Sequence, residues 1–197
     1  MPCSGILGYE NTNYLKVLEK QYRTGGKIMD LSITTEEING IRKQTRLALP
    51  NDNAYLLRLG VALYGFASIN SFMVEIICHI DKSQDQITVL SDYVSGKVLC
   101  VFRETLDKIK REGKYTEIHN IMQQTADLFD KLNSQRNDFV HSYPITNSKN
   151  EQILHRRKDN AGKYFEVNND FLTKFIGELC NVSDGLYKIR DAVCKIS

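Results

Sequence analysis

The sequence predicts an all-α protein, built mainly as an up-and-down four-helix bundle. Apolar residues recur at helical spacing over four long segments, and the 197-residue chain contains 3 prolines and no tryptophan. With 42% hydrophobic and 25% charged residues, the composition is that of a globular protein, which argues against a largely disordered chain.

The first 50 residues predict a helical extension, and residues 51–197 a main domain. One short helix carries Tyr14, Leu15, Leu18 and Tyr22, and a second begins at the capping sequence "TTEE" before Ile38. Pro50 then separates the extension from the rest. The N-terminus lacks a basic region followed by an apolar run, so we expect no secretory signal.

The main domain is expected to hold helices over about 52–80, 91–111, 116–140 and 169–195. The first of these is apolar on nearly every side. Residues 59–80 are long enough to span a bilayer, but they include Asn70, Glu75 and His79, so we expect a buried helix at the bundle centre and no membrane. Between the last two helices, "EQILHRRKDNAGKYFEVN" predicts a β-hairpin around a "DNAG" turn.

Composition also narrows the classes of function. A net charge of +2 does not by itself argue for a nucleic-acid partner. The 5 cysteines are widely spread without a CxxC pair, which argues against a disulfide framework and a zinc site. Histidines 79, 119 and 155 have no acidic or thiol neighbours at ligand spacing, so we expect no metal and no cofactor.

Arg136 interrupts the apolar face of the third long helix. With residues spaced at about 100° and Leu128 at zero, the apolar arc centres near 60°, and Arg136 falls inside it at about 80°. Burying a guanidinium without a partner is costly. Either the bundle opens to solvent here or an anion meets the arginine, and Glu75 is the best candidate for an internal partner.

His141 follows at the end of the same helix, shortly before Pro144. The helix dipole favours the protonated imidazole there, and Asn137, one turn earlier, can hydrogen-bond the ring or the last carbonyls. A cation, an imidazole and an amide at one helix end suit a phosphate and an in-line attack on it. The alternative is structural, because arginine and a capping histidine are both common at helix ends.

Arg136, Asn137 and His141 spell R-N-x-x-x-H, which resembles the R-x4-6-H signature of the HEPN superfamily. The resemblance covers about residues 52–195, where the motif lies near the end of the third long helix, as in that family. It implies a metal-independent endoribonuclease of a prokaryotic toxin–antitoxin or antiviral defence system. Arg136 would bind the scissile phosphate, His141 would act as general acid or base, and Asn137 would orient it.

The resemblance also implies partners. One motif supplies one histidine, so two copies would meet in a cytoplasmic homodimer around an RNA substrate. Tyr143 extends the pattern to R-x4-H-x-Y, and in some HEPN toxins that tyrosine is modified by a nucleotidyltransferase partner; here it also fits a packed turn residue. Arg156, Arg157 and Lys158 line a phosphate track or form a solvated face. The alternatives are a non-catalytic HEPN-like module for dimerisation or for binding RNA or protein, and a plain bundle in which Arg136 pairs with Glu75.

Overall fold

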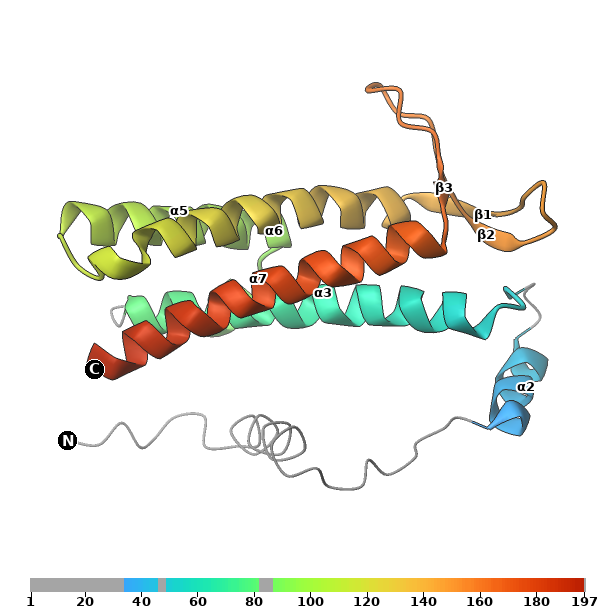
Figure 1. Ribbon diagram of the computed structural model, residues 1–197, viewed down its shortest axis with the longest axis horizontal. Coiled ribbons are helices and arrows are strands. Elements are labelled where there is room, and N and C mark those ends of the chain that lie inside the picture. Colours follow the sequence, from blue (N-terminus) through green and yellow to red (C-terminus); the bar gives the residue numbers. More distant parts are fainter. Residues whose placement is uncertain (1–33, 46–48, 82–86, 197) are drawn as a thin grey trace. The chain divides into compact units, whose positions relative to one another are not determined.

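The computed structural model describes residues 34–45, 49–81 and 87–196 (Figure 1). By its contacts the chain separates into two units, Met1–Ala48 and Leu49–Ser197. The expected helix around residues 14–22 lies outside the described residues.

In the first unit, the described helix is α2, Thr35–Gln44. It begins with a capping box: the Thr34 hydroxyl accepts the Glu37 N–H at 3.1 Å, and the Glu37 carboxylate accepts the Thr34 N–H at 2.7 Å. These two bonds satisfy amide groups that a helix start leaves without partners. The helix start predicted from "TTEE" is therefore confirmed.

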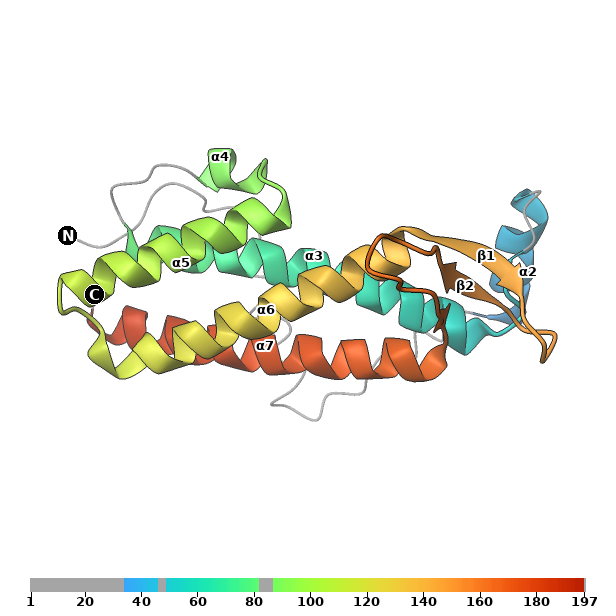
Figure 2. The same cartoon turned by 90° about the horizontal axis from the view of Figure 1, so that it is seen from above.

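The second unit is mostly helical. Its long helices are α3 (Asn53–Ile80), α5 (Ser95–Arg111), α6 (His119–Val140) and α7 (Asn169–Ile196), with a short α4 (Ile87–Ser91) before α5 and a 3-10 turn (Thr116–Ile118) before α6. Helix α3 packs against α5 and α7, and α6 packs against the same two helices (Figures 1 and 2). We call these four helices the helical core.

Aromatic side chains hold the centre of the helical core. Phe66 of α3 stacks on Phe129 of α6 with ring centroids 5.3 Å apart, and Phe139 meets Phe175 of α7 edge to face at 5.1 Å. Such pairs add to the free energy already gained by burying their area. Apart from Val140, which is 43% exposed, the apolar arc predicted on α6 lies in or against this core.

Helix α3 differs from its prediction. It was expected to be buried on all sides, yet Leu57 is 68% and Tyr64 71% exposed. The reason is that the helices packed on α3 bury the side that carries Phe66 and leave the opposite side uncovered in the second unit. In the described part of the chain, α3 is also the one helix long and apolar enough to cross a membrane, and 39% of that stretch is buried. A single helix of this kind is weak evidence for a membrane protein.

Between α6 and α7 lies a three-stranded antiparallel sheet in the order β1-β2-β3. The predicted hairpin is present as β2 (Gln152–Arg156) paired with the two-residue β3 (Glu166–Val167). The longer partner of β2 is β1 (Ser142–Thr146), which the sequence analysis did not predict. Strand β1 contains Pro144, and it tolerates the proline because it is an edge strand.

Tyr55 joins this sheet to α3. Its buried hydroxyl donates to the Val167 carbonyl at 3.0 Å and accepts the Leu154 N–H at 2.9 Å. Burial raises the pKa of the Tyr55 phenol, so the phenol stays protonated and keeps both bonds. The sheet is thereby fixed at the end of the helical core where α6 terminates.

Candidate anion site at the end of helix α6

Arg136 lies half-buried in the second-last turn of α6. Its guanidinium carbon is 5.7 Å from the centroid of the Phe66 ring, and Nη1 donates to Asn137 Oδ1 at 3.2 Å. Among the described residues no carboxylate pairs with it. The arginine is therefore held by an aromatic face and a neutral amide, and its charge is available to an anion.

The helical core is open at Arg136 because α5 starts too late to cover it. The Ser95 hydroxyl, at the first residue of α5, donates to Asn133 Oδ1 at 2.7 Å. Asn133 is one turn before Arg136, and Figure 2 shows α6 continuing past the start of α5 toward the sheet. The sequence left two explanations for Arg136: a bundle that opens to solvent there, or an anion that meets the arginine. The structure shows the first of these.

Glu75 does not pair with Arg136, so that prediction is wrong. Its Oε1 lies 3.5 Å from Nε2 of His79, one turn further along α3, so the expectation that His79 has no acidic neighbour at ligand spacing is wrong too. Arg136 instead contacts Phe66, which is nine residues and about 13 Å earlier on the same helix. Glu75 therefore lies too far along α3 to reach the arginine.

His141 is the C-cap of α6 and is exposed. Its backbone N–H donates to the Asn137 carbonyl at 3.0 Å. The Asn137 side chain is directed to Arg136, so the amide positions the arginine and not the imidazole, contrary to the expected role. Five residues along a helix also separate Arg136 and His141 by about 140°. The two side chains thus lie near one helix end but do not converge within one chain.

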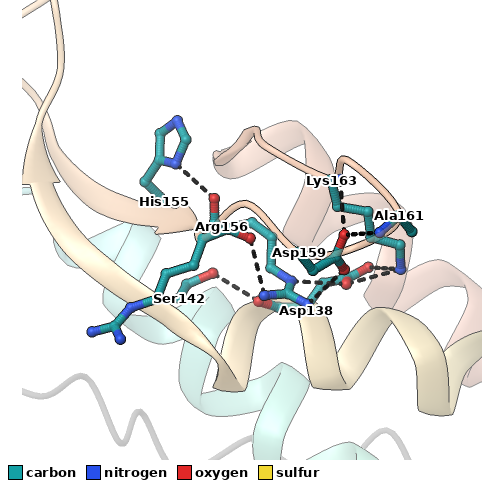
Figure 3. Close-up of polar contacts among 8 residues, drawn as sticks. Asp138, Ser142, His155, Arg156, Asp159, Ala161 and Lys163 are labelled. Atoms are coloured by element: carbon teal, nitrogen blue, oxygen red, sulfur yellow. Dashed lines mark hydrogen bonds and ion pairs between the residues drawn. The ribbon is translucent and has the colours of Figure 1, made fainter.

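Asp138 is a buried charged residue that the sequence analysis missed (Figure 3). Its side chain is 8% exposed, and its carboxylate accepts Arg156 Nε at 3.1 Å and Lys163 Nζ at 2.9 Å. Arg156 also reaches Asp159 at 3.1 Å. These pairs attach the segment after β2 to the last turn of α6. On a helical wheel Asp138 falls outside the apolar arc of α6, where a charged residue is expected to be exposed. Its burial could not be predicted, because the cations that pair with it come from distant positions in the sequence.

The three predicted RNA-binding residues have different surroundings. Arg156 is 13% exposed and paired with two carboxylates, which makes it a structural residue and not an open phosphate contact. Arg157 is exposed and stacks over the Tyr143 ring at 5.6 Å. Lys158 is exposed. The expected basic track is therefore reduced to its last two members.

Tyr143 lies in an aromatic group on the sheet. Its ring centroid is 5.8 Å from that of His155, which in turn is 4.2 Å from the ring of Tyr164. A hydrogen bond to Tyr164 raises the pKa of the Tyr143 phenol. His155, which is 9% exposed, pairs with Tyr143 across β1 and β2. The pairing of β1 with β2 brings the Tyr143 and His155 rings together. The sequence analysis did not predict β1, so it could not predict this aromatic group.

A separate cavity of about 470 Å³ lies where α3 and α7 begin, beside the turn between β1 and β2. Its lining is polar and includes Asp52, Glu151, Gln152 and Asp170. Neither Arg136 nor His141 lines it. In the described residues, no three histidine, cysteine, aspartate or glutamate side chains gather in a way that could hold a metal ion.

Comparison with known proteins assigns the chain to no family. No protein-family model, no curated protein and no solved structure matches the chain significantly.

Proposed function

We propose that the chain is a metal-independent endoribonuclease of the HEPN type that acts as a homodimer. The proposal is supported by the R-N-x-x-x-H sequence at residues 136–141 and by its position at the end of a long helix in a mostly helical protein. In this proposal, α3, α5, α6 and α7 form the up-and-down four-helix bundle of that superfamily.

The observation that carries the proposal is the contrast between Arg136 and Arg156. Both are partly buried and lie close to the same helix end. Arg156 has two carboxylate partners, whereas among the described residues Arg136 has none. A half-buried guanidinium held in place by Phe66 and Asn137, with its charge not neutralised, suits a phosphate oxygen.

The reaction is transesterification within the RNA. The 2′-hydroxyl loses its proton and attacks the adjacent phosphorus; the P–O5′ bond breaks, and the leaving oxygen takes up a proton. The products are a 2′,3′-cyclic phosphate and a 5′-hydroxyl. Arg136 stabilises the negative charge on the phosphorane, and the His141 residues of two copies supply the base and the acid.

The biological setting rests on the family resemblance. It comprises a cytoplasmic protein of a prokaryotic toxin–antitoxin or antiviral defence system, with an antitoxin or a nucleotidyltransferase as partner. A nucleotide attached to Tyr143 would lie beside Arg157, three residues beyond the end of α6. Bulk and negative charge there would oppose RNA binding at Arg136.

A second candidate function is a non-catalytic HEPN-like module for dimerisation or for binding RNA or protein. The observation that favours it is the angle of about 140° between Arg136 and His141 on α6. In such a module Arg136 binds an anionic group, and His141 only caps the helix.

Cleavage of a mixed RNA pool in EDTA separates the two functions. We expect the wild type to leave 2′,3′-cyclic phosphate ends, and Arg136→Ala and His141→Ala each to lower the rate at least about 100-fold. His119→Ala is the matched control, because His119 is a half-buried histidine at the opposite end of α6. Equal rates for the wild type and His141→Ala, or intact RNA throughout, would exclude the nuclease.

A further inference from the structure

Tyr164 presents an exposed ring on the aromatic group of the sheet. The residue is 62% exposed, although its ring centroid lies only 4.2 Å from that of the buried His155. His155 therefore contacts one part of the tyrosine ring, and most of the ring surface stays open to solvent. A tyrosine held in this way offers a flat apolar surface on which another ring can stack.

The turn before Tyr164 attaches it to the end of α6 (Figure 3). The Asp159 carboxylate accepts the backbone N–H of Lys163 at 3.0 Å, which closes the turn. The Lys163 ammonium donates to the buried Asp138 carboxylate at 2.9 Å. Asp138 belongs to the last turn of α6, so Tyr164 is fixed at the helix end that also carries Arg136.

Tyr143 links the aromatic group to the R-N-x-x-x-H motif. A hydrogen bond joins the phenols of Tyr143 and Tyr164, and the Tyr143 ring centroid is 5.8 Å from that of His155. Tyr143 follows the C-cap His141 by two residues, so their Cα atoms are at most about 7 Å apart. Each nucleotide of a stacked strand adds about 3.4 Å, so about two nucleotides bridge this distance. An RNA strand bound at Arg136 can therefore reach the aromatic rings.

Two cations beside these rings have no carboxylate partner among the described residues. Arg157 stacks over the Tyr143 ring at 5.6 Å, and Lys158 is exposed. The next carboxylate in the sequence, Asp159, already pairs with Arg156. Positive charge beside an exposed aromatic ring suits single-stranded nucleic acid, because phosphates meet the cations and bases stack on the ring. A duplex suits it less, since its bases are already paired and stacked.

We propose that Tyr143, His155 and Tyr164 form a platform on which an unpaired base of single-stranded RNA stacks. We call these three residues the stacking platform. The base lies on the open surface of Tyr164, and the flanking phosphates meet Arg157 and Lys158. The inference rests on the proposed function for the choice of RNA as ligand. It adds a preference for single strands and a substrate-binding residue, Tyr164, outside the motif.

Fluorescence anisotropy with a labelled single strand of 2′-O-methyl RNA, about ten nucleotides long, tests the stacking platform. We expect Tyr164→Ala to weaken binding at least about 5-fold, and Tyr164→Phe to stay within about 2-fold of the wild type, because phenylalanine keeps the stacking surface. Tyr64→Ala is the matched control, since Tyr64 is 71% exposed on α3 and should bind as the wild type does. Circular dichroism confirms that each variant is folded.

Two further probes separate stacking from charge alone. Inorganic polyphosphate carries phosphates without bases, so its affinity should be unchanged in Tyr164→Ala and lowered in Arg157→Ala. The same RNA annealed into a duplex should bind at least about 5-fold more weakly than the single strand, because its bases are not free to stack on the platform.

Tyr164→Trp gives a direct readout of stacking, because the chain contains no tryptophan. A base stacked on the indole ring quenches its fluorescence. We therefore expect the emission of Tyr164→Trp to fall when the 2′-O-methyl RNA is added, and that of Tyr64→Trp to stay unchanged.

Several outcomes would overturn the proposal: no binding of the RNA, equal affinities of the wild type and Tyr164→Ala for it, polyphosphate binding that falls as much as RNA binding in Tyr164→Ala, a duplex that binds as tightly as the single strand, or an unquenched Tyr164→Trp. A mononucleotide that binds as tightly as the RNA would assign the platform to a free nucleotide and would overturn it too. The 2′-O-methyl RNA lacks free 2′-hydroxyls and cannot be cleaved. Binding through Tyr164 without cleavage of ordinary RNA would thus contradict the nuclease and leave the platform in place.

Discussion

At the scale of single residues, Asp138 determines how the segment after β2 attaches to the helical core. Its carboxylate is 8% exposed and forms ion pairs with both Arg156 and Lys163. Asp138→Asn would leave two cations without this partner, so we expect a loss of about 2 to 4 kcal/mol in the free energy of unfolding, measured with urea. Asp127→Asn is the control, because Asp127 is 58% exposed and its pair with Arg103 should contribute less than about 1 kcal/mol. Equal losses for the two variants would contradict a structural role for the buried network.

Tyr55 gives a prediction for pH. Because burial raises the pKa of its phenol in the folded protein, the folded state holds this proton more tightly than the unfolded chain does. Its contribution to stability is present in full below the unfolded pKa of about 10 and is lost as pH rises through the folded value. Tyr55→Phe removes both hydrogen bonds and should lower stability by about 1 to 3 kcal/mol at pH 7. Urea unfolding from pH 8 to pH 11 should show a smaller decline for Tyr55→Phe than for the wild type, and an equal decline would contradict this account.

At the scale of elements, helix α7 approaches α6 closely at Gly185. A Cβ atom added there would overlap the buried Thr125 hydroxyl, so Gly185→Ala requires the Thr125 side chain or the two helices to shift. We expect Gly185→Ala to lower the melting temperature, although alanine is the better helix former. Gly177→Ala on the same helix meets no atom within 4 Å and should leave stability unchanged or raise it by up to about 1 kcal/mol. A stabilising Gly185→Ala would mean that the contact between α6 and α7 is loose.

The elements also show what the sequence could and could not predict. Helix α6 was predictable because its apolar residues repeat at helical spacing, and α2 because "TTEE" supplies both halves of a capping box. Strand β1 was missed because Pro144 interrupts its apolar alternation, and only the neighbouring strand shows that this edge needs no donor there. The exposed side of α3 was not predicted for another reason. Between Arg58 and Glu75 the helix carries no charged residue to mark a polar face, so a helical wheel could not separate its buried side from its exposed side.

At the scale of the whole molecule, the sequence predicted which residues belong to the candidate site but not how they are arranged or paired. The helical wheel placed Arg136 in the apolar arc. That no carboxylate within 34–45, 49–81 and 87–196 pairs with it depends on where α5 begins, and the sequence around Arg136 does not show this. The pairing with Glu75 was wrong for the same reason, since it depends on the level at which α3 and α6 cross. Arg136 and His141 lie about 140° apart on one helix, and in the proposed nuclease the site would combine these residues from two copies of the chain.

Cleavage rate per chain, measured in EDTA over a range of protein concentrations, tests this central claim most directly. A site assembled from two copies predicts that the rate per chain rises with concentration in parallel with the fraction of dimer found by sedimentation, and that it reaches a plateau when dimerisation is complete. The cleaved RNA should carry 2′,3′-cyclic phosphate ends, and an RNA lacking 2′-hydroxyls should stay intact. No cleavage at concentrations where the protein is fully dimeric, or a rate per chain that does not change with concentration, would contradict the account.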